Sequence, residues 1–87
     1  MYVILIYDVN ACRDAKVLKC CRKYLMAVQR SSFEGFITGS KLKELKEKLD
    51  AIIDVKEDSV CFYQMETPRY AQREMIGKMS DRDNILL

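Results

Sequence analysis

The sequence predicts an α+β protein, a ferredoxin-like sandwich whose elements follow the order β-α-β-β-α-β. Three observations lead to this class. The chain opens with a continuous apolar run, it contains two amphipathic helical stretches, and its remaining apolar stretches are short and bounded by turn residues. A chain of 87 residues has room for one core. We expect residues 1–66 to form this domain and residues 67–87 to form a C-terminal extension that adds strands to a dimer.

The first predicted strand is the run from Tyr2 to Tyr7, which contains no charged side chain. A strand that lacks alternation is typical of a position covered on both faces of a sheet. In this fold both helices lie on one face, so the other face would stay uncovered. We therefore expect a second copy of the chain to cover it, which makes the protein a homodimer.

The first helix is predicted from Ala11 to Ala27, with Asn10 as its N-cap and Asp14 in its first turn. Apolar side chains recur at helical spacing along one face, and four basic side chains fall on the opposite arc. These four are Arg13, Lys16, Lys19 and Lys23. The helix is therefore predicted to be amphipathic, with a basic outer stripe.

A hairpin, a second helix and a last strand complete the predicted domain. Residues 29–33 and 36–38 are predicted to pair across a tight turn at Glu34-Gly35. The second helix is predicted over residues 41–54, where leucine and isoleucine recur on one face and lysine and glutamate on the other. Residues 60–65 then form an apolar strand.

Composition narrows the classes of function. Lys and Arg number 15 and Asp and Glu number 13, and this net charge of +2 is far from the balance of a protein that coats nucleic acid. Residues 1–30, however, carry six basic and two acidic side chains, so a phosphate would dock in this part of the chain.

The cysteines favour a core role over metal chemistry. The chain has 4 cysteines, no Cys-x-x-Cys pair and no histidine, so zinc is not expected and the cysteines are predicted to be small core residues. The apolar start is too short to span a membrane and has no basic flank before it. We expect a cytoplasmic protein with reduced thiols and no membrane partner.

Asp8 is the candidate catalytic and metal-binding residue, because it ends the most apolar strand, and ligand sites in open sheets gather at carboxyl ends of strands. Its carboxylate could instead cap the next helix or end the strand. As an oxygen ligand it suits Mg²⁺, which needs only one or two carboxylates beside waters and phosphate oxygens. Two copies of Asp8 near a two-fold axis would supply the second carboxylate.

Four basic residues are candidates for contacts with a nucleic-acid backbone, since phosphate contacts require charge and no base-reading motif. Arg13 and Lys16 would lie near Asp8, and Lys23 and Arg30 would contact backbone further away. The alternative is a solvated helix face. An aromatic platform that stacks RNA bases is disfavoured, because most of the aromatic residues lie in strands expected to form the core.

Motifs along the whole chain form an ordered set. They are Tyr7-Asp8-Val9, Arg13, residues 16–19 and 22–25, Val28-Gln29 with Ser31, Phe33-Glu34-Gly35, Thr38, Asp58-Ser59-Val60 with Tyr63, and residues 74–77 and 84–86. At these spacings the set resembles the Cas-two family, the small adaptation proteins of CRISPR systems. Two positions of the hairpin depart from the family pattern: Ser32 stands where members commonly have Val, and Arg30 where they often have Asn.

The resemblance implies a homodimer with both copies of Asp8 close to its axis, acting as a Mg²⁺-dependent endonuclease on RNA or DNA. It also implies a part in acquiring new spacers with the CRISPR integrase. The alternative hypothesis is a non-catalytic dimeric scaffold that bridges integrase subunits and holds duplex DNA, with Asp8 structural. A small-molecule-binding module is a third hypothesis, for which the sequence has no pocket signature.

Overall fold

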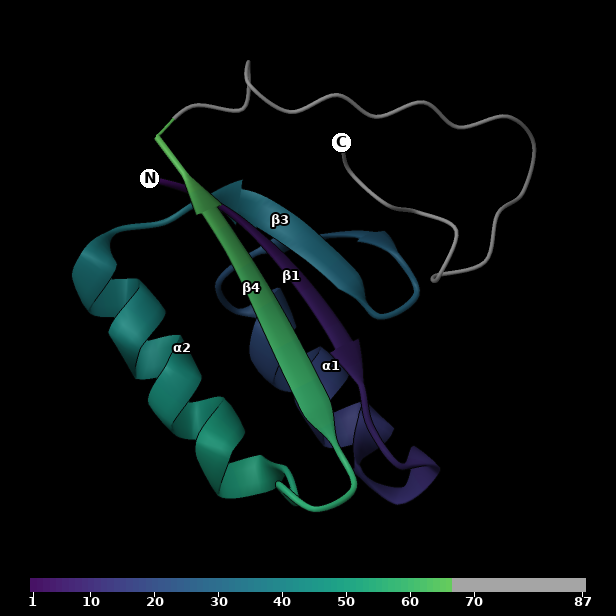
Figure 1. Ribbon diagram of the computed structural model, residues 1–87. Coiled ribbons are helices and arrows are strands. Elements are labelled where there is room, and N and C mark those ends of the chain that lie inside the picture. The colour runs from purple at the N-terminus through teal and green to yellow at the C-terminus, as the bar shows by residue number, and fades with distance from the viewer. Residues whose placement is uncertain (67–87) are drawn as a thin grey trace.

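The computed structural model describes residues 1–66, in which one four-stranded sheet packs against two helices (Figure 1). The elements are β1 (Tyr2–Asp8), α1 (Ala11–Arg22), β2 (Met26–Gln29), β3 (Ser32–Phe36), α2 (Gly39–Ile52) and β4 (Ser59–Met65). The strand order is β2-β3-β1-β4, with every neighbouring pair antiparallel. The predicted ferredoxin-like class is thereby confirmed. The predicted C-terminal extension lies outside the described residues.

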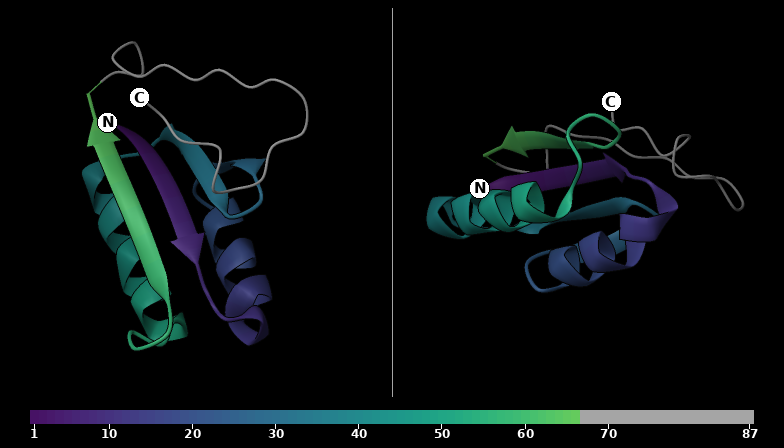
Figure 2. Two further views of the ribbon diagram at one scale, coloured as in Figure 1. Left: turned by 45° about the vertical axis from the view of Figure 1, so that its right-hand side comes forward. Right: turned by 90° about the horizontal axis from the view of Figure 1, so that it is seen from below.

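Both helices cover the same face of the sheet (Figure 2). Because side chains alternate across a strand, Val3, Leu5 and Tyr7 of β1 all point to this face and pack with Phe33 of β3. The other members of this buried core are Val17, Cys20, Cys21, Leu25, Ile37, Leu42, Leu45 and Leu49.

The opposite face carries no helix within residues 1–66, and we call it the open face. Strand register and alternation assign to it Tyr2, Ile4, Ile6, Asp8, Met26, Ser32, Glu34, Phe36, Ser59, Cys61, Tyr63 and Met65. Ile4 at its centre is buried, whereas several large apolar side chains around it are exposed.

The first helix ends earlier than predicted. The N–H of Lys23 donates to the carbonyls of Cys20 and Cys21, and the N–H of Leu25 donates to Cys21, so the chain turns after Arg22. Residues 26–29 form an edge strand because they pair with β3, and this pairing overrides the helical period. Leu25 follows the apolar spacing of the helix and is buried in the same core, although it lies in the turn after α1. The prediction therefore extended the helix too far.

The hairpin turn was also predicted at the wrong place. It lies at residues 30–31, between β2 and β3, while Glu34 and Gly35 lie inside β3 and pair with β1. Ser31 has a φ of 63°, the left-handed conformation that tight hairpin turns use. Glycine usually takes such positions, so a serine gave no turn signal.

The second helix and the last strand agree with the prediction within two residues. Thr38 is the N-cap of α2, and its Oγ1 accepts the N–H of Lys41 at 3.2 Å, so the helix starts at Gly39.

Neither helix in the described part of the chain has the length and apolar content that crossing a membrane requires.

The four thiols are free, and two of them are buried while the other two are exposed to solvent. Cys20 and Cys21 are buried as predicted, and burial raises the pKa of the Cys21 thiol to about 12. Cys12 and Cys61 are exposed, against the prediction, because one begins α1 and the other lies on the open face.

Candidate metal and nucleic-acid site at the end of β1

Asp8 is the last residue of β1 and is exposed to solvent. Its register partner is Ser59, the first residue of β4, so it lies at the end of the sheet where the central strand β1 finishes and the edge strand β4 begins. Alternation places its side chain on the open face, with Tyr2, Ile4 and Ile6. A charged residue can end this apolar strand because its carboxylate reaches solvent.

A surface depression of about 500 Å³ includes Asp8, the first turns of α1 and the β2–β3 turn. Two carboxylates, those of Asp8 and Asp14, and the guanidinium of Arg30 line it. Arg30 therefore lies closer to Asp8 than predicted, because the hairpin turn at residues 30–31 carries it to this end of the sheet.

The donor set of this depression fits Mg²⁺, which prefers carboxylate oxygens and keeps several waters. Within residues 1–66, no three Cys, Asp or Glu side chains converge into a complete metal site. One chain thus offers one or two carboxylates, the number that suffices only when waters, phosphate oxygens or a second copy complete the coordination.

Arg13 contacts two carboxylates of the loop between α2 and β4. Its Nε donates to Oδ2 of Asp58 at 2.5 Å, and its Nη2 donates to Oδ1 of Asp58 at 3.1 Å and to Oε1 of Glu57 at 2.8 Å. These hydrogen bonds raise the pKa of Arg13, and the guanidinium holds the pKa of Asp58 well below its usual range. The phosphate contact predicted for Arg13 stays a prediction, in which phosphate would compete with these carboxylates.

From the sequence, Asp58 belongs only to the ordered set of motifs and has no predicted role in the site. Its side chain is 0% exposed, and its carboxylate also accepts the N–H groups of Asn10 and Asp54. Its main partner, Arg13, is 45 residues away in the chain, so no local sequence signal could indicate the pair.

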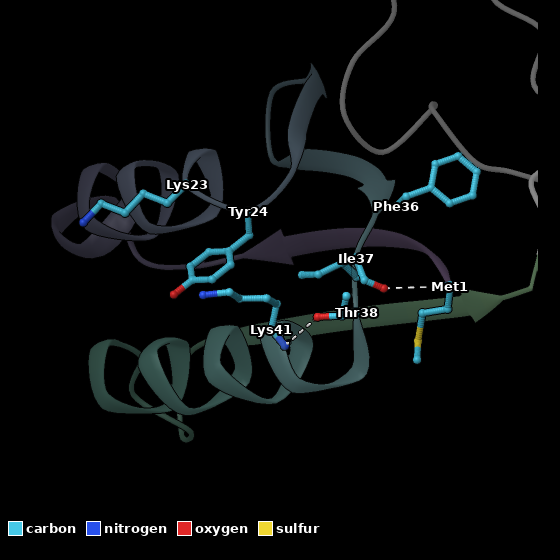
Figure 3. Close-up of a pocket in the computed structure, with 7 residues that line it drawn as sticks. All are labelled: Met1, Lys23, Tyr24, Phe36, Ile37, Thr38 and Lys41. Atoms are coloured by element: carbon cyan, nitrogen blue, oxygen red, sulfur yellow. Dashed lines mark hydrogen bonds between the residues drawn. The ribbon is translucent and has the colours of Figure 1, made fainter.

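The lysines predicted to contact phosphate do not form one patch. Lys16 is exposed in the first half of α1 but does not line the depression that contains Asp8, and Lys23 lies just beyond the end of α1. Lys23 lines a different cavity of about 500 Å³, together with Tyr24 and with Lys41 from α2 (Figure 3). Exposed positive charge therefore extends along α1 and reaches the far end of the molecule.

This geometry defines a small ferredoxin-like domain with an exposed carboxylate at the end of its first strand and an arginine in the same depression. Residues 1–73 match the family model described as CRISPR associated protein Cas2. The chain belongs to this family, which confirms the predicted resemblance.

Two relatives are similar over nearly their whole length. A protein of Dictyoglomus turgidum is 47% identical over 87 residues, which cover 99% of this chain and 100% of the relative. One of Thermotoga maritima is 44% identical over 86 residues, covering 99% of each. Both carry the name CRISPR-associated endoribonuclease Cas2.

Solved structures support the same fold. The crystal structure of Streptococcus pyogenes Cas2 at pH 6.5 is 34% identical, with a TM-score of 0.78 over 88% of this chain and 100% of that one. A second structure, described as cas2, is 43% identical, with a TM-score of 0.70 over 72% of this chain and 71% of that one.

Proposed function

We propose that this protein is a Mg²⁺-dependent endonuclease that acts as a homodimer in the cytoplasm and takes part, with the CRISPR integrase, in acquiring new spacers. The observation that carries the proposal is the position of Asp8, an exposed carboxylate on the open face in a depression that also contains Arg30. The relatives' name, endoribonuclease, makes RNA the first substrate to test.

Exposed apolar side chains on the open face support the homodimer. Met26, Phe36 and Tyr63 are 74%, 68% and 52% exposed. Apolar side chains gathered in this way on one face are typical of an interaction surface. A second copy related by a two-fold axis would cover them with the same face. Asp8 lies on that face too, so such a dimer would place both copies of Asp8 on the shared surface.

The residues around Asp8 divide the work of the proposed reaction. Asp8 from each chain would hold Mg²⁺, with Asp14 as the other carboxylate in the depression. When bound, the ion would polarise a phosphoryl oxygen and lower the pKa of the attacking water. Arg30 and Lys16 would neutralise phosphates on either side of the scissile bond, in the manner of contacts that carry no sequence information. The chain has no histidine to act as a base.

The second candidate is a non-catalytic scaffold that holds duplex DNA and bridges integrase subunits. The spread of exposed lysines from Lys16 to Lys23 and Lys41 favours it, because this span of charge exceeds what one scissile phosphate requires. Both candidates need a dimer, and they differ in what they require of Asp8.

The experiment that tests the proposal compares cleavage of single-stranded RNA and duplex DNA, with and without Mg²⁺, by three proteins. These are the wild type, Asp8→Asn and the control Asp50→Asn, which makes the same change at an exposed position of α2. We expect the wild type and the control to cleave, and Asp8→Asn to bind the nucleic acid without cleaving it. Cleavage by Asp8→Asn at the wild-type rate and Mg²⁺ dependence would exclude the catalytic role and leave the scaffold.

A further inference from the structure

Four residues form a polar cluster around the buried carboxylate of Asp58, close in the chain and in strand register to Asp8. Asn10 and Arg13 come from the start of α1, and Asp54 and Asp58 come from the loop between α2 and β4. We call this group the clamp. Glu57, with its side chain 54% exposed, contacts Arg13 at the rim.

The centre of the clamp is the Asp58 carboxylate, which accepts four hydrogen bonds. Oδ1 accepts the N–H of Asn10 at 2.8 Å and Nη2 of Arg13 at 3.1 Å. Oδ2 accepts Nε of Arg13 at 2.5 Å and the N–H of Asp54 at 2.9 Å. Both oxygens are therefore occupied by donors that the chain itself supplies, and this fully satisfied geometry allows a charge to be buried.

The clamp holds the backbone near Asp8 at two places, one just after Asp8 in the chain and the other next to its register partner on β4. Asn10, whose N–H is bound by Asp58, lies two residues after Asp8 in the chain. Ser59, the register partner of Asp8, directly follows Asp58. The Asp58 carboxylate thus binds the chain just after the end of β1, and Asp58 itself stands just before the start of β4, the strand that pairs with β1. Asn10 adds the N-cap of α1, accepting the N–H of Cys12 at 3.0 Å.

We propose that Arg13 and Asp58 are positioning residues for Asp8: the clamp holds the end of β1 so that the Asp8 carboxylate is aimed at the depression. This inference rests on the proposed function, in which Asp8 binds a metal ion. A site built from one carboxylate per chain depends strongly on where that carboxylate points, since small misplacements of a ligand cost much of its effect. The rigid fork of Arg13, which bonds both oxygens of Asp58, provides this orientation in a way that lysine cannot.

The test uses the full-length variants Asp58→Asn and Arg13→Lys, with Asp50→Asn as the matched charge control and Glu57→Gln as the rim variant. Mn²⁺ affinity is measured by water-proton relaxation, RNA affinity without metal by fluorescence anisotropy, and exchange of the Asp8 and Asn10 amides by NMR. We expect Asp58→Asn and Arg13→Lys to weaken Mn²⁺ binding roughly tenfold or more, in the range seen for residues that orient ligands. Amide exchange at Asn10 should accelerate in both variants, and RNA affinity without metal should not fall in Asp58→Asn, which leaves every basic side chain in place. Asp50→Asn should match the wild type, and Glu57→Gln should have the smaller effect.

Two outcomes separate a failure of this inference from a failure of the proposed function. If Asp8→Asn weakens Mn²⁺ binding while folded Asp58→Asn and Arg13→Lys bind it as the wild type does, the clamp does not position Asp8. If Asp8→Asn leaves Mn²⁺ binding unchanged, the proposed function fails, and the exchange rates decide on the clamp. Wild-type exchange at Asp8 and Asn10 in both variants would then overturn it. Arg13→Lys retains the charge, so it provides the test if Asp58→Asn does not fold.

Discussion

The two faces of the sheet are built from the same strands but differ in how much of their apolar side chains is exposed to solvent. On the covered face, Phe33 is 0% exposed and its ring stacks on Tyr7 with a centroid distance of 6.2 Å. On the open face, Phe36 of the same strand is 68% exposed, and its ring makes a T-shaped contact with Tyr2 with the ring centroids 5.0 Å apart. The covered face is finished within one chain, and the open face is the one that also presents Asp8. The difference indicates that one face maintains the fold, which leaves the other available for the proposed dimer and the proposed metal site.

The largest expected effect comes from a matched pair of phenylalanines. Phe33→Ala should lower the free energy of unfolding by about 3–5 kcal/mol, because it leaves a cavity in the core. Phe36→Ala should lower it by less than about 1 kcal/mol, because its ring is largely in solvent. Urea denaturation at a low protein concentration, where the chain is monomeric, measures both. Equal losses for the two variants would show that the faces do not differ in this way.

The next largest effect is on assembly. Phe36→Glu and Tyr63→Glu each place a charge on the open face, and desolvating it in a dimer is costly. We expect the wild type to sediment as a dimer at micromolar concentration and both variants to shift toward the monomer while retaining the wild-type circular dichroism spectrum. Lys43→Glu, an exposed change on α2, provides the control and should stay dimeric. A wild-type protein that sediments only as a monomer would refute the role of the open face.

Low pH should distinguish the clamp from the covered face. The clamp is held by charged groups that acid can protonate, whereas the covered face is held by apolar side chains. The guanidinium of Arg13 holds the pKa of Asp58 below its value in the unfolded chain. The stabilisation that ionised Asp58 contributes to the fold is therefore complete above about pH 4, the ordinary pKa range of an aspartate. It is lost as the pH falls further. The free energy of unfolding of the wild type should decrease below that pH more steeply than that of Asp58→Asn. Parallel acid profiles in urea denaturation would contradict this account.

The smallest effect concerns Ser32, the register partner of Ile6 on the open face. It is only 1% exposed, and its Oγ has no hydrogen-bond partner in the described part of the chain. Burying an unsatisfied hydroxyl costs free energy, so Ser32→Val should stabilise the fold by about 1 kcal/mol. Ser32→Ala, which removes the hydroxyl without adding volume, controls for packing. A loss of stability in both variants would show that the hydroxyl has a partner in the assembled protein.

The sequence predicted the fold class well because apolar periodicity records which side chains the helices and the sheet bury. It failed at the hairpin, where Leu25 continued the helical period from a turn and Ser31 took a conformation usually given to glycine. It placed Asp8 at the end of its strand because strand ends are a local feature. The pairing of Arg13 with Asp58 was missed because it is tertiary, and Arg30 was placed too far from Asp8 because the turn was misplaced.

In the proposed dimer, the open faces of two chains bring two copies of Asp8 to one metal ion. Counting Mn²⁺ ions bound per chain, by titration of a sample whose dimeric mass has been confirmed by sedimentation, tests this claim most directly. We expect one Mn²⁺ for every two chains in the wild type and in Asp50→Asn, and none in Asp8→Asn at the same concentrations. One ion per chain, or unchanged binding in Asp8→Asn, would contradict it.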